Sequence, residues 1–281
     1  DHLILQFEKK NNITFAESQK DAIISAFQNG IEIITGGPGT GKTTIIKCII
    51  EIFETCGLKV LLGAPTGRAA KRMSESTGKE ATTIHRMLDM GVFEKEESVF
   101  VTNAEEHSLE ADVVIIDEAS MIDITLMNAL LKSIKVGTRL IIVGDVDQLP
   151  SVGAGNVLND FIESGFTKVV RLKEIFRQGK ESMIVVNAHK INKGEMPKLN
   201  EKGTDFFFIR NDIQEGILNT IIDLINTRLP KFNSNWDKLK SIQVLVPMKK
   251  GVLGVTNLNE RIQNVLNPKA PYKKEKEFRS M

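Results

Sequence analysis

A glycine-rich run with one lysine and three threonines carries the clearest chemistry in this sequence. Residues 36–44 read Gly-Gly-Pro-Gly-Thr-Gly-Lys-Thr-Thr and fit the spacing G-x-x-x-x-G-K-[ST]. The glycines let the backbone turn several N–H groups toward one anion, and a helix beginning at Lys42 adds its positive N-terminal end. The alternative is an incidental glycine-rich turn. The apolar run before the motif and the helical pattern after it favour a nucleotide site.

The chemistry of this motif assigns a role to its polar residues. Lys42 is expected to reach the β- and γ-phosphates, and the Thr43 hydroxyl is expected to ligate Mg²⁺. The predicted nucleotide-binding residues are Gly37, Pro38, Gly39, Thr40, Gly41, Lys42, Thr43 and Thr44. Gln19, which lies ahead of the motif, is predicted to contact the adenine edge.

Two acids follow an apolar run of four residues. Residues 113–116 read Val-Val-Ile-Ile, and Asp117 and Glu118 come next. The C-terminal end of a buried parallel strand lies at the ligand edge of its sheet, so Asp117 is expected beside the phosphate loop. There Asp117 would hold Mg²⁺ and Glu118 would deprotonate the attacking water. The alternative is a solvated acidic strand end.

A glutamine follows the next apolar run. Residues 140–145 read Leu-Ile-Ile-Val-Gly-Asp, and Gln148 comes three residues later. A glutamine leaving the same sheet edge can donate to the γ-phosphate, so Gln148 is the predicted sensor that links hydrolysis to motion. The alternative is a polar loop residue before Pro150.

The elements that position these residues alternate between apolar strands and helices. This βαβ alternation predicts an α/β fold with a doubly wound parallel sheet. The predicted strands are Ile31–Thr35, Lys59–Gly63, Asp112–Ile116, Arg139–Val143 and Thr167–Leu172. The predicted helices are Ser18–Gln28, Lys42–Thr55, Gly67–Glu75, Thr82–Leu88 and Ile124–Ser133. The polar stretch at about 91–108 interrupts the pattern and is predicted to be a small inserted hairpin.

A second α/β pattern begins after residue 178, so we expect one domain over 1–178 and part of another over 179–281. Its predicted helices are Ser182–Asn192, Ile213–Arg228 and Thr256–Leu266, and its predicted strands are Phe206–Ile209 and Ile242–Val246. Two strands do not make a sheet. The second domain is therefore expected to be incomplete.

The bulk composition describes an ordinary globular protein. The chain has 281 residues, 41% of them hydrophobic and 26% charged, with a net charge of +1. Any basic surface must therefore be local. Cys48 and Cys56 would lie about 12 Å apart on one helix, too far for a disulfide, which favours a reduced cytoplasmic protein. No signal peptide or membrane-length apolar run is visible.

The order of the motifs resembles superfamily-1 helicases, and more narrowly the ATP-dependent RecD-like DNA helicases. The resemblance rests on Gln19, the run 36–43, Ala-Pro-Thr-Gly-Arg-Ala-Ala at 64–70, Asp-Glu-Ala-Ser-Met at 117–121, Gly-Asp-Val-Asp-Gln-Leu-Pro at 144–150, and Glu-Ile-Phe-Arg-Gln at 174–178. It continues through residues 187–197 and 244–254. It thus covers nearly the whole chain.

The resemblance implies a motor of two RecA-like domains that bind ATP between them and step 5′ to 3′ along single-stranded DNA. Arg177 would contact the γ-phosphate across the cleft; the alternative is a surface arginine in a linker. The implied DNA contacts are Pro65, Thr66, Gly67 and Arg68 in one domain and Met248, Lys249 and Lys250 in the other. The alternative for each is a solvated basic loop. The inserted hairpin resembles in position the family's strand-separating pin.

The expected partners of the whole motor are single-stranded DNA and duplex junctions, with no membrane, and the expected state is a monomer. Nothing after Pro268 matches the further motifs of the family's second domain, so we expect a chain truncated there. Two other functions remain open. The first is a binding module that holds ATP and single strands without turnover. The second is an RNA helicase or another phosphate-loop ATPase.

Overall fold

The structure, a computed structural model of the chain, describes residues 2–90, 108–174 and 182–268. The chain divides into two compact units, Asp1–Phe207 and Phe208–Met281. Among the described residues, no helix combines the length and the apolar character needed to cross a bilayer.

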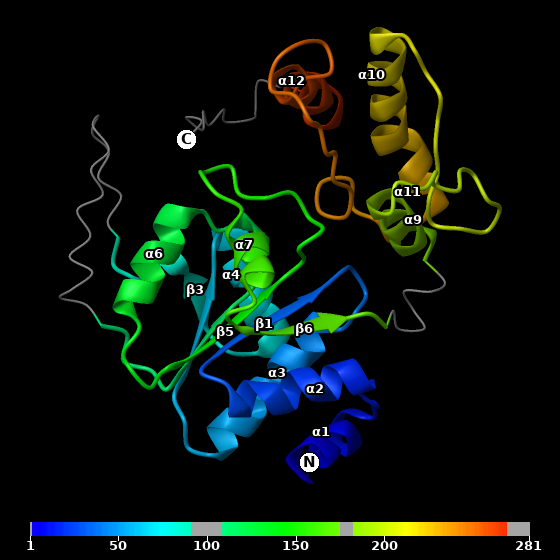
Figure 1. Cartoon of the computed structure of the whole chain (residues 1–281). Helices are drawn as coiled ribbons and strands as arrows, with labels where there is room; N and C mark the ends of the chain where they lie inside the picture. Colours follow the sequence, from blue (N-terminus) through cyan, green and yellow to red (C-terminus); the bar gives the residue numbers. More distant parts are fainter. Residues whose placement is uncertain (1, 91–107, 175–181, 269–281) are drawn as a thin grey trace. The chain divides into compact units, whose positions relative to one another are not determined.

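A parallel six-stranded sheet forms the centre of the first unit (Figure 1). The strand order is β3-β2-β4-β5-β1-β6, and every pairing is parallel. The strands are β1 (Ile31–Gly36), β2 (Val60–Ala64), β3 (Ala81–Thr83), β4 (Val113–Ile116), β5 (Arg139–Gly144) and β6 (Lys168–Leu172). Because all six run the same way, their C-terminal ends meet at one edge of the sheet.

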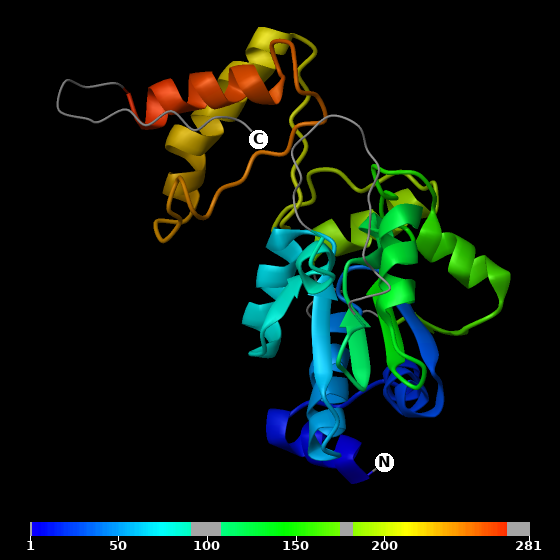
Figure 2. The same ribbon diagram turned by 90° about the vertical axis from the view of Figure 1, so that its left-hand side faces the viewer.

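Helices cover both faces of this sheet (Figures 1 and 2). One face packs against α1 (His2–Asn11), α2 (Glu17–Gln28), α3 (Lys42–Thr55) and α4 (Gly67–Thr77). The other packs against α5 (Ile84–Met87), the short η1 (Ala119–Met121), α6 (Ile124–Ser133) and α7 (Val157–Ser164). A further helix, α9 (Met183–Asn192), belongs to the same unit.

The strand residues alternate between the two hydrophobic cores. Ile34 and Ile115 belong to the core under α1–α4, whereas Ile33 and Ile116 belong to the core under α5–α7. Successive strand side chains point to opposite faces, so a strand buried on both faces must be apolar throughout. Each fully buried isoleucine contributes about 1.5–3 kcal/mol relative to an exposed one.

The predicted doubly wound sheet is confirmed, and all five predicted strands are present to within one residue at either end. Three helices in the described part of the first unit have no counterpart in the prediction: α1, ahead of the first predicted element, the short η1 and α7. The predicted helix Thr82–Leu88 divides into the edge strand β3 and the shorter α5. A three-residue strand is too short to display a period of two, and its pairing with β2 is what makes it a strand.

The predicted strands Phe206–Ile209 and Ile242–Val246 are wrong. Among its described residues the second unit contains α10 (Gln214–Asp223), the π-helix η2 (Leu224–Arg228), α11 (Leu229–Phe232) and α12 (Val255–Leu266), and no strand. Side chains of residues 242–246 do alternate between half-buried and exposed. A strand also needs a neighbour for its backbone hydrogen bonds, and neither segment has one within the part of the chain that the structure describes.

One buried acid departs from the apolar pattern of β1. Glu32 is 1% exposed and accepts a hydrogen bond from the Ser25 hydroxyl, and its Oε2 atom has no partner among residues 2–90, 108–174 and 182–268. Burial raises its pKa to about 7; Ser25 and Lys168 oppose the rise, and Asp21 adds to it. The charged form is therefore disfavoured in the folded state.

The Glu32→Gln variant should lose a pH dependence of stability. The folded pKa of about 7 exceeds the ordinary 4.5, so stability should fall as pH rises from 4.5 through 7, by up to roughly 3 kcal/mol. The neutral amide has no proton to lose, so the variant should unfold at a higher temperature than the parent at pH 8 and at a similar one at pH 4.5. Thermal unfolding followed by circular dichroism at both pH values measures this. Equal pH slopes for parent and variant would contradict it.

Candidate nucleotide site

The glycine-rich loop joins β1 to α3 at the C-terminal edge of the sheet. Gly39 and Gly41 adopt left-handed backbone conformations, with φ of 76° and 85°, which side chains rarely tolerate. Gly36 is confined instead by its neighbours, because a Cβ atom there would lie 2.8 Å from both Leu172 Cβ and Thr40 Oγ1. The tight turn therefore needs glycine at these places for two different reasons.

Side chains of the loop bond to the loop itself. The Thr40 hydroxyl, in a residue 2% exposed, donates to the Gly37 carbonyl at 2.8 Å. The Lys42 ammonium donates to the carbonyls of Gly36 and Gly37, the latter at 3.1 Å. Lys42 thus points back along the loop. When a nucleotide is bound, phosphate oxygens would replace the two carbonyls as hydrogen-bond acceptors of its ammonium group. Thr43 is exposed and Thr44 half-buried at the first turn of α3.

Asp117 and Glu118 follow β4, which is separated from β1 by β5 alone. The Asp117 carboxylate accepts the Glu118 N–H at 2.9 Å. Burial raises the pKa of Asp117 above its ordinary value, whereas that hydrogen bond and the charges of Lys42 and Arg72 lower it. Asp117 therefore lies within electrostatic reach of the loop lysine. Glu118 has a left-handed φ of 55°, a strained conformation often found at functional sites.

Gln148 lies beyond β5 and is exposed. Its amide nitrogen donates to Asp145 at 3.4 Å, and the buried Asp145 also accepts the Asp147 N–H at 3.1 Å. Asp145 thus holds the turn that carries Gln148. The sensor role of Gln148 stays a prediction.

Gln19 is 2% exposed and joins α2 to the loop. Its amide nitrogen donates to the Thr40 carbonyl at 2.9 Å, and its amide oxygen accepts the Ala16 N–H at 3.0 Å. The structure therefore gives Gln19 a role in supporting the loop, which the sequence did not suggest. The predicted contact with adenine stays a prediction; the second amide hydrogen is the group available for it.

The predicted DNA-contacting residues 65–68 lie at the start of α4, after β2, at the same sheet edge as the loop. The Thr66 hydroxyl oxygen accepts the Ala69 N–H at 3.2 Å as the N-cap, and Gly67 and Arg68 are exposed. Pro65 is half-buried. His85, in the short helix α5, is also exposed, and the N-cap of that helix is Thr83, whose hydroxyl oxygen accepts the Arg86 N–H at 3.2 Å.

The other predicted DNA residues belong to the second unit. Met248, Lys249 and Lys250 are exposed in the turn before α12. Their backbone is held in place, because the Lys249 carbonyl accepts the Thr256 hydroxyl at 3.3 Å and the Met248 carbonyl accepts the Val255 N–H at 3.0 Å. Arg177 and residues 91–107 of the predicted hairpin lie outside the described residues.

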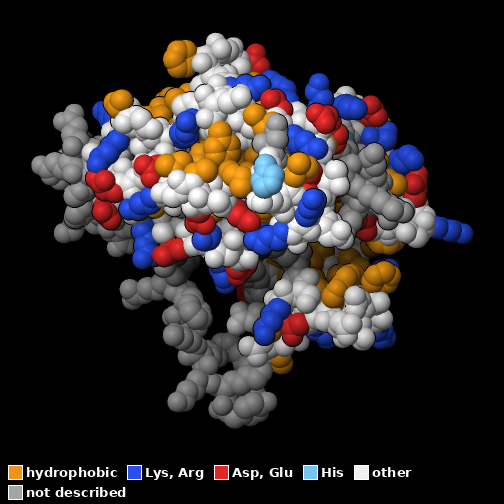
Figure 3. Space-filling view, turned by 90° about the horizontal axis from the view of Figure 1, so that it is seen from below, with side chains coloured by type: hydrophobic (Ala, Val, Ile, Leu, Met, Phe, Trp, Pro, Cys, Tyr) orange, Lys and Arg blue, Asp and Glu red, His pale blue; other side chains and the backbone are white. Residues whose placement is uncertain are grey.

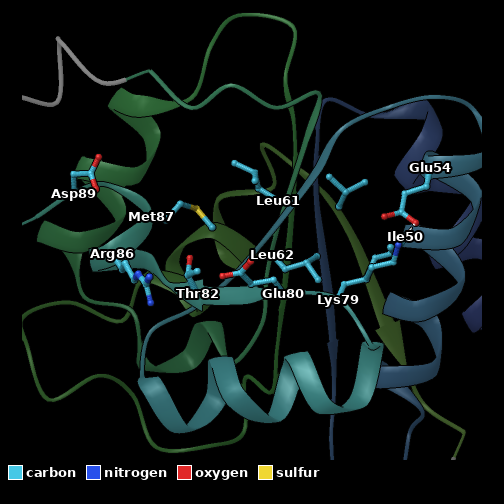
Figure 4. A pocket seen from close by; sticks show the side chains of 11 residues that line it. Ile50, Glu54, Leu61, Leu62, Lys79, Glu80, Thr82, Arg86, Met87 and Asp89 are labelled. Atoms are coloured by element: carbon cyan, nitrogen blue, oxygen red, sulfur yellow. Dashed lines mark ion pairs between the residues drawn. The ribbon is translucent and has the colours of Figure 1, made fainter.

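Two surfaces away from the loop have a different character. A cavity of about 520 Å³ lies beside β2 and β3, and both basic and acidic side chains line it, with Lys79 paired to Glu54 at 2.8 Å (Figure 4). Seen from the α1 side, basic and acidic side chains intermingle (Figure 3). Neither surface has the single-sign charge that favours a phosphate backbone.

A divalent cation could be held by hard oxygen ligands at this edge. Asp117 supplies a partly desolvated carboxylate and Thr43 a hydroxyl. Among the described residues no group of three or more His, Cys, Asp or Glu side chains could enclose a metal. Mg²⁺ usually takes one or two carboxylates and completes its shell with water and substrate phosphates, and Asp117 and Thr43 are ligands of that kind.

Comparison with known proteins gives a consistent set of relatives. A family model described as an AAA domain matches residues 19–154. The ATP-dependent RecD2 DNA helicase of Deinococcus radiodurans is 35% identical over 260 residues, covering 92% of this chain and 34% of the relative. The RecBCD enzyme subunit RecD of Mycolicibacterium smegmatis is 37% identical over 187 residues, covering 58% of this chain and 33% of the relative.

A solved structure shares the fold. The crystal structure of the Pif1 helicase from Candida albicans matches with a TM-score of 0.51 at 23% identity, over 66% of this chain and 45% of that one. The chain spans about a third of the length of the two curated relatives above.

Proposed function

This chain belongs to the RecD-like family of superfamily-1 helicases, and from that premise we propose that it is the ATP-hydrolysing part of a DNA motor. It binds Mg²⁺ and ATP at the glycine-rich loop and couples hydrolysis to 5′ to 3′ movement on single-stranded DNA. The observation that carries the proposal is the meeting of three groups at one sheet edge. Lys42 begins α3, whereas the consecutive residues Asp117 and Glu118 follow β4, and the charge of Lys42 lowers the pKa of Asp117.

The chain's own residues divide the work of hydrolysis. The backbone N–H groups of residues 37 and 39–44 and the Lys42 ammonium bind the phosphates, and Pro38, which has no N–H, shapes the loop between them. Thr43 and Asp117 hold Mg²⁺, which when bound neutralises developing charge on the phosphates. Glu118 accepts the proton of the attacking water. Gln148 reports the presence of the γ-phosphate, and Arg177 stabilises transition-state charge from across a cleft.

The DNA contacts are proposed at two places. At residues 65–68, Thr66 offers a hydroxyl, Gly67 a backbone N–H and Arg68 a guanidinium to a backbone phosphate. In the second unit, at residues 248–250, the ammonium groups of Lys249 and Lys250 supply positive charges beside Met248. Contacts of this kind carry no base sequence, which suits a protein that moves along DNA.

We place the boundary between the two RecA-like motor domains at residues 178 and 179. The compact units divide later, between Phe207 and Phe208, so α9 packs with the first unit. We propose that residues 179–281 are the beginning of the second motor domain.

Single-stranded DNA should stimulate ATP hydrolysis by this chain. An arginine supplied across a closing cleft accelerates phosphoryl transfer by about 10³–10⁵-fold in other phosphate-loop enzymes, so even a small closed fraction gives a measurable rise. Steady-state hydrolysis with and without poly-dT, and with poly-rU as the matched RNA, measures it. If the chain binds nucleotide but DNA does not stimulate hydrolysis, it is a binding module without turnover. If RNA stimulates hydrolysis more strongly than DNA, it is an RNA-dependent enzyme.

A further inference from the structure

His189 of α9 presents a buried nitrogen to the glycine-rich loop. A Cβ atom built on Gly37 would lie 2.8 Å from His189 Cε1 and 3.5 Å from its Nε2, so the imidazole is seated on the loop backbone. The Nε2 atom is buried and has no hydrogen-bond partner within the described part of the chain. Buried polar atoms in native proteins are nearly always paired, so an unpaired one at a ligand loop suggests that its partner is the ligand.

The ring contacts one particular end of the loop. Lys42 bonds to the carbonyls of Gly36 and Gly37, and this lysine is the loop residue that reaches the β- and γ-phosphates. The Gly36–Gly37 segment therefore marks the terminal-phosphate end. Thr43 and Thr44, at the first turn of α3, lie farther along the loop.

The helix that carries His189 is held firmly. Asn187, 1% exposed, donates to the Lys198 carbonyl and accepts the Lys198 N–H, both at 2.8 Å. The Ser182 hydroxyl accepts the Val185 N–H at 3.4 Å as the N-cap. The imidazole is thus presented by a rigid element, which is the arrangement that precise ligand positioning requires.

We propose that His189 is a nucleotide-binding residue whose Nε2–H donates a hydrogen bond to the terminal phosphate of the bound triphosphate. This contact makes α9, and the segment that Asn187 fastens to it, respond to the difference between a triphosphate and a diphosphate. The proposal rests on the proposed nucleotide site and adds to it a residue that the glycine-rich motif does not contain.

Two substitutions separate the hydrogen bond from the packing of the ring. His189→Phe keeps a flat ring against Gly37 and removes the nitrogen, whereas His189→Gln loses the ring and keeps a donor near the position of Nε2. Ile184→Ala, an exposed residue on the same helix, is the control. Equilibrium binding of fluorescent AMP-PNP and fluorescent ADP, both with Mg²⁺, is measured on the full chain.

His189→Phe should weaken AMP-PNP binding about 10- to 100-fold, the usual effect of losing a hydrogen bond to a charged group, and leave ADP binding nearly unchanged. His189→Gln should recover most of the AMP-PNP affinity. Equal weakening of both nucleotides in both variants, or unchanged AMP-PNP binding in His189→Phe, would overturn the proposal. Failure of the parent chain to bind either nucleotide would instead refute the nucleotide site itself.

Discussion

Replacing Lys42 with alanine should abolish ATP hydrolysis and weaken nucleotide binding at least 100-fold. The Lys42 ammonium already donates to the Gly36 and Gly37 carbonyls of the loop. When a nucleotide is bound, phosphate oxygens would replace these carbonyls as its hydrogen-bond acceptors. Each charge-assisted hydrogen bond contributes about 1.5–3 kcal/mol, and the lysine makes more than one of them to the β- and γ-phosphates. Steady-state hydrolysis and fluorescent-nucleotide binding measure the two losses.

Lys47→Ala is the matched control, because Lys47 is an exposed lysine on the same helix α3. It should hydrolyse and bind like the parent. The Lys42→Ala variant should also keep a melting temperature near that of the parent, since only two bonds to loop carbonyls are lost. Ordinary ATPase activity in a folded Lys42→Ala variant would refute the assignment of the loop.

The Glu118→Gln variant should bind Mg²⁺·ATP almost as the parent does and hydrolyse it several orders of magnitude more slowly. Glutamine has the same shape as glutamate and carries no carboxylate to accept the proton of water, and general bases contribute about 10²–10⁴-fold. The backbone N–H of Glu118, which bonds to Asp117, is unaffected by the substitution. The left-handed φ of 55° is a backbone cost shared by both side chains.

Binding and single-turnover hydrolysis have to be measured on the same preparation. Glu163→Gln, a change of the same kind at an exposed position of α7, is the control and should leave both unchanged. Should nucleotide affinity in Glu118→Gln fall in parallel with the rate, Glu118 would be a structural residue and the water-activating base would have to be another group.

The fold of the first unit could largely be predicted because its strands and helices are marked by patterns of neighbouring residues in the sequence. Apolar runs such as Val113–Ile116 could be placed only as buried parallel strands between helices, and the acids that follow had to meet the loop at one edge. The same reasoning was wrong for Ile242–Val246. Its alternating burial resembles that of a strand, but a strand is defined by a partner, and no local pattern supplies one.

Motif matching assigns roles to residues without showing which other residues they contact. Gln19 was predicted to contact adenine, and the structure shows its amide supporting the loop through Thr40. His189 was part of a matched run and had no assigned role until the fold placed it over Gly37. In the same way, Glu32 appeared only as one acid in an apolar strand, and its raised pKa follows from burial between helices and neighbouring strands.

The sequence by itself determined the order of the strands along the chain, the glycine-rich loop, and the acids and glutamine at the strand ends. These follow from spacing and from the alternation of apolar residues, which are properties of neighbours in the chain. Only the tertiary structure decided the support of the loop by Gln19, the burial of Glu32, and the place of the His189 nitrogen, which has no partner among the described residues. Each of these depends on contacts between segments far apart in sequence, whose geometry is fixed when the helices pack on the sheet.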